Sequence, residues 1–330
     1  MSRKISRSFI NGRTGVGTAG QGLKVEWDST NDGELHWKDV SESSLEVVAP
    51  VFQGSNYGFS SGGGNEVADT TDRVDRFAFS SSGGATDVGD LSVARQFPSG
   101  SSSGTESFAS GGNAGGASNV IDKFTFSAGG VATDHGDLAT ARQMGSGQSS
   151  TTHGYNSGGT GLDDEIEKFA FASNTTATDV GNMTAARYAL SGQSSSTDGF
   201  VSGGYRFGNS SVVDKFSFSS DGDATSHGDL SVARYDPTGQ SSTDYGFASG
   251  GYSSNVIDRF AFASNTTATD WGNLSVARQG GAGISETNYG FTAGGYAKNE
   301  IDRFAYSSNT TATDWGDLTL ARYYPAGTQY

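Results

Sequence analysis

The chain has 330 residues, of which 33% are hydrophobic and 50 are glycine, and its formal net charge is −15. So acidic a protein is not expected to bind nucleic acid or an anionic membrane as its main partner. The absence of cysteine excludes disulfides and thiolate chemistry. No apolar run approaches the ~20 residues of a membrane helix, so we expect no membrane insertion, and the basic start lacks the apolar run of a secretory signal.

Residues 1–45 are predicted to form an N-terminal docking arm. They begin with a basic, glycine-rich stretch that has no hydrophobic periodicity and is expected to be extended. Two Trp-bearing segments then flank Asn31, Asp32 and Gly33, which predicts a small hairpin. A hairpin of this size needs a surface to pack on. The residues expected to make the docking contacts are Arg3, Lys4, Arg7, Phe9, Trp27 and Trp37.

Residues 46–330 contain one unit six times. Each copy has a Gly-Gly pair, then a run of Val or Ile, an acidic residue, a basic residue and Phe, and finally an arginine. These arginines are Arg95, Arg142, Arg187, Arg234, Arg278 and Arg322. Their separations of 47, 45, 47, 44 and 44 residues are typical of propeller blades. We therefore predict an all-β fold, a six-bladed propeller of four-stranded antiparallel blades.

Each copy is predicted to contain four strands, a to d. Strand a follows the arginine, strand b ends at the Gly-Gly pair, and strand d is the Ala-Thr-Asp-x-Gly segment or its equivalent. Strand c carries two aromatic residues at positions i and i+2, such as Phe77 and Phe79. Residues at this spacing share one face of a strand and would diverge on a helix. Only the b–c connection varies in length between copies.

The variable b–c loops are the predicted binding region. In an antiparallel meander they lie at the same end of the ring as the d–a connections, and variable loops on a rigid scaffold usually carry recognition. Aromatic and arginine side chains are typical of binding hot spots. The candidate binding residues are Tyr205, Arg206, Phe207, Tyr252, Tyr296 and Lys298. The alternative is that these side chains pack over the blade edges.

The C-terminus is predicted to close the ring. Residues 323–330 have the pattern of a strand a with no strand b after it, whereas residues 56–63 have the pattern of a strand b near the start. The C-terminal strand would then complete the first blade. Residues 46–54 are the alternative occupant of that position.

The Gly-Gly pair, the aromatic strand c, a Trp in strand d and the terminal Leu-x-x-Ala-Arg together resemble kelch-type repeats over residues 55–330. Strand d has Trp271 and Trp315 in two copies, and the other copies depart from the pattern with Val88, His135, Val180 and His227. The resemblance implies a propeller that serves as a binding or structural module. The copper oxidases of that family need a cysteine, which this chain lacks. The short, polar and nearly uniform repeats are also similar to those of propeller proteins in tailed-phage virions.

The charged residues and histidines of the repeats are interpreted as structural. The six arginines could capture an anion, but contacts to carbonyls or to a carboxylate of the same or the next blade are favoured. The aspartates proposed as their partners are Asp87, Asp134, Asp179, Asp270 and Asp314. His135 and His227 take the Trp position, so packing is favoured over metal binding, and we expect no metal and no cofactor. Loop carboxylates Asp163, Asp164 and Glu165 leave open a glycoside hydrolase.

These patterns predict a non-enzymatic structural or adhesion protein, a component of a phage virion in the tail, in a fibre or on the capsid, that displays a β-propeller. The arm would bind other virion proteins, and the propeller could bind a glycan or protein on a host surface or form a homo-oligomer in an assembly. The alternative is a free lectin-like or protein-binding propeller, extracellular or cytoplasmic, that uses the b–c loop face. A hydrolase that uses loop carboxylates is the third hypothesis.

Overall fold

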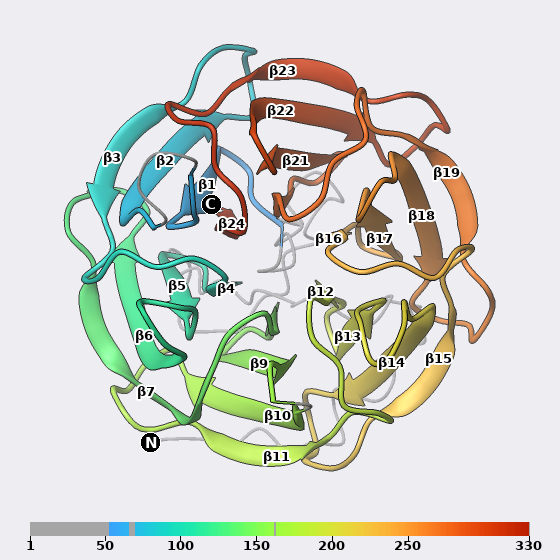
Figure 1. The fold of residues 1–330 in the computed structure, drawn as a ribbon, viewed down its shortest axis with the longest axis horizontal. Helices are drawn as coiled ribbons and strands as arrows, with labels where there is room; N and C mark the ends of the chain where they lie inside the picture. The colour runs from blue at the N-terminus through green and yellow to red at the C-terminus, as the bar shows by residue number, and fades with distance from the viewer. Residues whose placement is uncertain (1–52, 66–69, 162, 330) are drawn as a thin grey trace, which may run out of the picture. The chain divides into compact units, whose positions relative to one another are not determined.

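A computed structural model describes residues 53–65, 70–161 and 163–329. In this part of the chain the structure is all-β, and six four-stranded antiparallel sheets form the blades of a ring (Figure 1). The predicted six-bladed propeller is confirmed. The boundary between residues 45 and 46, the predicted hairpin and the docking residues Arg3, Lys4, Arg7, Phe9, Trp27 and Trp37 lie outside the described residues. A membrane-spanning helix is not found among the residues that the structure describes.

The four strands of each blade follow the predicted order from the axis outward. Strand a is β4 (Ser99–Ser102), β8 (Ser146–Ser149), β12 (Ser191–Ser194), β16 (Thr238–Ser241), β20 (Ala282–Ser285) and β24 (Ala326–Gln329). Strand b is β1 (Tyr57–Ser61), β5 (Glu106–Ser110), β9 (His153–Gly159), β13 (Asp198–Ser202), β17 (Tyr245–Ser249) and β21 (Tyr289–Gly295).

Strand c is β2 (Arg73–Ala78), β6 (Ser118–Thr125), β10 (Asp163–Ala170), β14 (Val212–Ser217), β18 (Val256–Ala261) and β22 (Lys298–Ala305). Strand d is β3 (Thr86–Asp90), β7 (Thr133–Arg142), β11 (Thr178–Asn182), β15 (Thr225–Asp229), β19 (Thr269–Asn273) and β23 (Thr313–Asp317). Blade 1 comprises β24 and β1–β3, and blades 2 to 6 are the consecutive groups of four from β4–β7 to β20–β23.

The C-terminal strand closes the ring, as predicted. Strand β24 pairs antiparallel with β1, with Thr328 opposite Phe59. The described part of the competing segment lies elsewhere, because the Gly54 N–H donates to the Ser285 carbonyl at 2.8 Å. The side chain of Gln53 donates to the carbonyl of Ser241 at 3.0 Å. Residues 53 and 54 therefore lie beside the C-terminal ends of the inner strands of blades 5 and 6.

Aromatic side chains fill the space between neighbouring blades. An aromatic residue in strand b packs on the second aromatic residue of the next blade, which directly follows strand c, with ring centroids 4.6 to 5.0 Å apart. The six pairs are Phe59–Phe126, Phe108–Phe171, Tyr155–Phe218, Phe200–Phe262, Phe247–Tyr306 and Phe291–Phe79. Burying each such ring contributes about 1.5–3 kcal/mol. The i, i+2 aromatic pattern therefore forms the inter-blade core.

Glycine brings the six inner strands close together around the axis. A Cβ atom added to Gly192 would lie 2.1 Å from the carbonyl oxygen of Gly147 in the next inner strand. The same contact recurs at 2.1 to 2.2 Å for all six glycines, which are Gly100, Gly147, Gly192, Gly239, Gly283 and Gly327. Real Cβ atoms do not approach an oxygen so closely, so any larger residue here would force the inner strands apart.

A closed ring of hydrogen bonds joins the C-terminal ends of the inner strands. The backbone N–H of Ser149, for example, donates to the hydroxyl of Ser194 in the next blade at 3.0 Å. The same step, with lengths of 2.9 to 3.2 Å, runs through Ser102, Ser149, Ser194, Ser241, Ser285 and Gln329 and returns to Ser102. The serine-rich inner strands thus satisfy their polar groups by pairing with one another near the axis.

Candidate functional site

Each repeat arginine forms a buried ion pair with strand c of the following blade. The Arg187 side chain, after β11 of blade 3, lies 3.0 Å from the carboxylate of Asp214 in β14 of blade 4. Every side chain in these pairs is 3% exposed or less. The pairs are Arg95–Asp122, Arg142–Glu167, Arg187–Asp214, Arg234–Asp258, Arg278–Asp302 and Arg322–Asp75. The last pair joins the two ends of the ring.

Further hydrogen bonds support the buried pairs. Asp258 accepts the backbone N–H of Ser231 at 2.9 Å and its hydroxyl at 2.6 Å. Arg234 also donates to the carbonyls of Ala248 and Val256, in strands b and c of the blade that it contacts. Buried charges are tolerated only when paired and hydrogen-bonded in this way. The guanidinium groups are therefore not available to an anion at the end of the ring.

The pair between blades 2 and 3, Arg142–Glu167, has two residue changes that compensate for each other. Its acidic residue is Glu167, whereas the other five are Asp, and the residue at the Ser or Thr position is Ala139. Glu167 accepts the backbone N–H groups of Ala139 and Thr140 at 2.6 and 3.0 Å. The longer acid thus reaches the arginine and the backbone where the neighbouring hydroxyl is missing.

The expected partners of the arginines in strand d were wrong. These aspartates instead accept the backbone N–H of the glycine two residues later, as Asp179 does from Gly181 at 3.0 Å. The same turn is formed by Asp87, Asp134, Asp179, Asp270 and Asp314. Aspartate is favoured at such turns because its short side chain reaches its own backbone. Both sets of aspartates are structural, but only those of strand c neutralise the arginines.

The buried histidines occupy the position of strand-d tryptophan and make the same contact. The Nε2 atom of His135 lies 2.9 Å from the carbonyl oxygen of Ala170 in the next blade. Trp315 donates its indole N–H to the carbonyl of Ala78 at 3.0 Å in the equivalent place. Among the residues that the structure describes, no three His, Cys, Asp or Glu side chains group as a metal site would require.

The acidic residues predicted for the b–c loop of blade 3 lie at the start of β10, where two of them contact Arg142. Asp163 and Glu165 lie 3.2 and 2.9 Å from Nη2 of Arg142. These contacts give Asp163 and Glu165 a structural role beside the Arg142–Glu167 pair.

The sequence analysis missed six residues that surround the axis, each the second residue after a repeat arginine. Their φ angles of 55° to 63° lie in the left-handed region, which costs a non-glycine residue about 1–2 kcal/mol. Five backbone hydrogen bonds of 2.6 to 3.1 Å connect successive members. The six are Phe97, Met144, Ala189, Asp236, Gly280 and Tyr324. Strained backbone of this kind is concentrated at functional sites.

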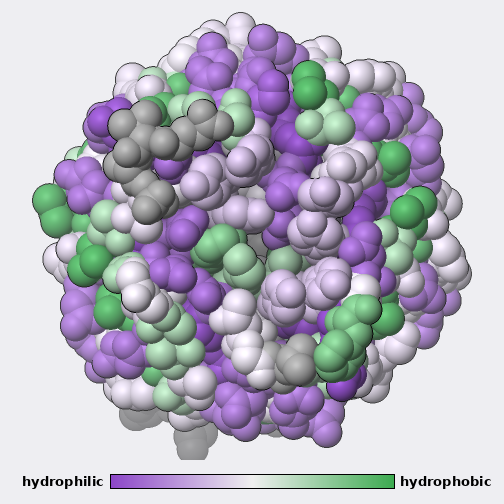
Figure 2. All heavy atoms as spheres, viewed as in Figure 1, coloured by the Kyte–Doolittle hydropathy of each residue, from purple (hydrophilic) through white to green (hydrophobic). Residues whose placement is uncertain are grey.

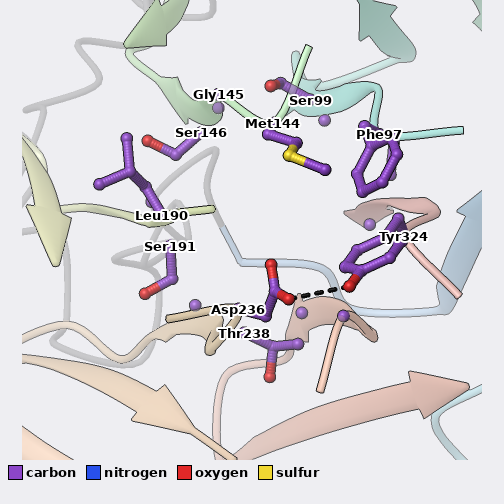
Figure 3. A pocket seen from close by; sticks show the side chains of 18 of the residues that line it. Phe97, Ser99, Met144, Gly145, Ser146, Leu190, Ser191, Asp236, Thr238 and Tyr324 are labelled. Atoms are coloured by element: carbon purple, nitrogen blue, oxygen red, sulfur yellow. Dashed lines mark hydrogen bonds between the residues drawn. The ribbon is translucent and has the colours of Figure 1, made fainter. Parts of the chain in front are cut away.

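These residues border an axial cavity of about 130 Å³, lined by side chains that include Phe97, Met144, Leu190, Asp236 and Tyr324 (Figure 3). The space-filling view shows the end of the ring where the d–a connections lie, with a hollow at the axis (Figure 2). The six equivalent backbone positions carry six different residue types, so the side chains differ from one side of the cavity to the other.

Asp236 is the charged residue of this ring. The residue is 7% exposed, and one carboxylate oxygen accepts the hydroxyl of Tyr324 at 2.9 Å. Burial raises the pKa of Asp236 from 3.8 to about 6, and the hydrogen bond from Tyr324 opposes this rise only in part. The Tyr324 ring also packs on Gly280 and lies 4.1 Å, between centroids, from the ring of Phe97. Asp236 is thus held in place beside an aromatic wall.

Around the cavity, tyrosines from the d–a connections and the b–c loops contact one another in two groups, which we call the tyrosine arc. The first group contains Tyr188, Tyr205, Tyr235 and Tyr252, with successive centroids 5.6, 5.7 and 5.0 Å apart. The second contains Tyr296 and Tyr323 at 5.5 Å, and Tyr323 contacts Tyr324 of the cavity. The structure therefore brings together three predicted residues, Tyr205, Tyr252 and Tyr296, with tyrosines that were not predicted.

The predicted binding residues differ in their exposure and in their contacts. Phe207 is 84% exposed on a b–c loop, and the guanidinium of Arg206 lies 5.7 Å from its ring. Lys298 lies 3.6 Å from Glu300 of its own strand. Tyr252 and Tyr296 are 54% and 58% exposed although they stack on other rings. The predicted alternative, packing over the blade edge, thus describes only part of their surface.

The backbone pairing between the d–a connection and the b–c loop is the same in blades that lack tyrosine there. Tyr205 forms a bridge with Tyr188 in blade 4, and Asn113 forms the equivalent bridge with Gln96 in blade 2. The arc covers blades 4, 5, 6 and 1, and blades 2 and 3 carry Gln96, Asn113, Gln143 and Thr160 at these positions. The scaffold therefore does not require tyrosine at this place. Comparison with known proteins finds no matching family model and no matching curated protein.

Asp236→Asn tests whether burial raises the pKa of this carboxyl group. The folded state binds the Asp236 proton more tightly than the unfolded state, so the free energy of unfolding should fall as the pH rises from about 4 to 6. The variant should lack this fall and be more stable than the native chain at pH 7, by on the order of 2–3 kcal/mol. Near pH 4 the two should differ little. Urea unfolding at pH 4, 5.5 and 7 measures the difference.

The control for this experiment is Asp229→Asn, since Asp229 is exposed at the same end of the ring. Its difference from the native chain should stay within about 0.5 kcal/mol at every pH. A lower stability of Asp236→Asn at pH 7, or two parallel pH curves, would contradict a raised pKa. Asn tolerates a positive φ angle as well as Asp does, so the backbone contributes little to the comparison.

Proposed function

We propose that this protein is a non-enzymatic adhesion or display component of a tailed-phage virion, built from kelch-type repeats, whose propeller binds a ligand through the tyrosine arc. The observation that carries the binding role is the one-sided distribution of tyrosine on a sixfold scaffold. Blades 2 and 3 form the same backbone contacts with Gln, Asn and Thr. Tyrosine on four adjacent blades, exposed at Tyr252 and Tyr296 and half-buried elsewhere, is therefore not needed to fold the ring.

The chemistry of the arc suits a carbohydrate or a protein surface. Neighbouring tyrosines that hold one another in place offer apolar faces together with hydroxyl groups, which is the combination that stacks on sugar rings and anchors protein interfaces. The Gln, Asn and Thr side chains of blades 2 and 3 add hydrogen-bonding groups on the same end of the ring. A host-surface glycan is the ligand that this mixture favours.

The position of residues 53 and 54 supports attachment through the N-terminal arm. They lie beside the C-terminal ends of β16 and β20, next to the a–b turns. The tyrosine arc lies at the opposite end, where the inner strands begin. Residues 53 and 54 lie at one end of the ring and exposed aromatic residues lie at the other, and this separation is suited to display. The proposal of a virion component rests on the short, polar and nearly uniform repeats and on the basic N-terminal segment.

The arc is tested by a pair of substitutions that the scaffold already accommodates. Tyr235→Gln with Tyr252→Asn copies the Gln96–Asn113 pair of blade 2 into blade 5, where the two tyrosine rings stack 5.0 Å apart. On a glycan array, the native full-length chain should bind at least one glycan, and the variant should bind it about tenfold or more weakly because stacking area is lost. Val131→Ser, an exposed change between β6 and β7, should bind as the native chain does. If no glycan on the array is bound, or if the arc variant binds as tightly as the native chain, the proposal that the arc binds carbohydrate is refuted.

The arm is tested by deletion of residues 1–45. A chain without this segment should be absent from assembled virions, because the proposed docking contacts lie within it, while the Tyr235→Gln, Tyr252→Asn chain should be incorporated at the native level. Immunoblotting of purified particles measures both. Normal incorporation of the shortened chain would contradict docking through the arm and would favour the free lectin-like propeller.

A further inference from the structure

Asp236 is not explained by the scaffold. The five equivalent axial positions hold Phe, Met, Ala, Gly and Tyr, so the fold forms without a carboxylate at this place. The residue is buried, with 7% of its surface exposed, and none of the described cationic side chains forms an ion pair with it. A buried carboxylate without a counter-charge is costly. Each of the six repeat carboxylates, in contrast, has its arginine.

The carboxylate is turned toward the cavity. Figure 3 shows one oxygen bonded to the Tyr324 hydroxyl, while the other points into the open space. The side chains of Met144 and Phe97 lie across the cavity from Asp236, and Leu190 forms part of the wall. One side of the cavity therefore carries a negative charge and the other is apolar. A ligand that fits both sides has a positively charged head and a short hydrocarbon chain.

We propose that the axial cavity binds an alkylammonium group, with Asp236 as its counter-ion. The Tyr324 hydroxyl holds the carboxylate in place, and Met144, Leu190 and Phe97 contact the hydrocarbon chain. The cavity of about 130 Å³ greatly exceeds the ~15 Å³ that a single water molecule needs. A bare metal ion would need several oxygen ligands, whereas an ammonium group is satisfied by one carboxylate and neighbouring hydroxyl or carbonyl groups.

The site also accounts for the charge at this position. Burial raises the pKa of Asp236 and so disfavours its ionised form. This lowers stability at neutral pH, and residues that lower stability are retained where function requires them. Binding of an ammonium group would neutralise the carboxylate and recover part of the lost free energy. The inference is independent of the tyrosine arc, because it uses a different set of side chains.

Titration of the full-length protein with n-butylammonium tests the proposal. Chemical-shift changes should follow a saturable curve with the native chain and with Asp229→Asn, which removes an exposed carboxylate from the same end of the ring. Affinity should fall about tenfold or more in Asp236→Asn, because the charge-assisted bond is lost. n-Butanol, which has the same chain and no charge, should bind at least about tenfold more weakly than n-butylammonium.

The pH dependence supplies a second readout. Affinity for n-butylammonium should fall about tenfold from pH 7 to pH 5, because Asp236 with a pKa of about 6 is mostly protonated at the lower pH. The neighbouring titratable groups are the hydroxyls of Tyr324 and Tyr235, and burial raises the pKa of both, so neither changes charge in this range. The Asp236→Asn chain should show no such dependence.

Two sources of the ammonium group are separated by a second probe. Nα-acetyl-lysine methylamide carries its ammonium on a four-carbon chain joined to a peptide backbone. If it binds as tightly as n-butylammonium, the cavity accepts a lysine side chain of a partner protein; if it binds at least tenfold more weakly, the site takes a free amine. Either result supports the ammonium site. Absence of saturable binding by both probes, equal binding of n-butanol, or undiminished binding to Asp236→Asn would overturn it.

Discussion

The buried pairs between each repeat arginine and the strand-c acid of the next blade fix how the six blades meet. Each guanidinium lies at the end of one blade and donates to a carboxylate and to strand carbonyls of the following blade. A buried pair adds little net stability compared with apolar packing, yet losing one partner leaves a costly isolated charge. The pairs therefore select one blade-to-blade geometry. Stacked aromatic rings outside them and the hydroxyl ring near the axis repeat the same junction six times.

Much of the fold could be predicted from the sequence because its determinants are local and repeated. The i, i+2 aromatic residues of strand c and an arginine that recurs every 44 to 47 residues predicted the blades. Residues 323–330 predicted that the C-terminal strand closes the ring. The arginine partners were harder to predict, since strands c and d both offer an aspartate. One available signal was the joint change at Glu167 and Ala139, which links strand c to the segment before Arg142.

The candidate site was only half predictable, for a physical reason. Tyr205, Tyr252 and Tyr296 lie in the variable loops, where sequence comparison between copies directs attention. The tyrosines that contact them come directly after the repeat arginines, in connections of fixed length, and were not predicted as binding residues. The axial residues share no side-chain chemistry, and only closure of the ring brings residues as distant as Asp236 and Tyr324 together. Their common property is a left-handed backbone, which sequence alone shows poorly when the residues are not glycine.

The central claim, that the buried charge pairs fix how the blades meet and cannot lose one partner without cost, is tested most directly at the closing pair. Asp75→Asn leaves Arg322 buried without its counter-ion, and burial already lowers the pKa of Arg322 to about 10 even with Asp75 present. The comparison is Asp221→Asn, which removes the exposed partner of Lys168. Urea unfolding should show a loss of about 3–5 kcal/mol for Asp75→Asn and less than about 1 kcal/mol for Asp221→Asn. Equal small losses would mean that the aromatic core closes the ring without the buried pair.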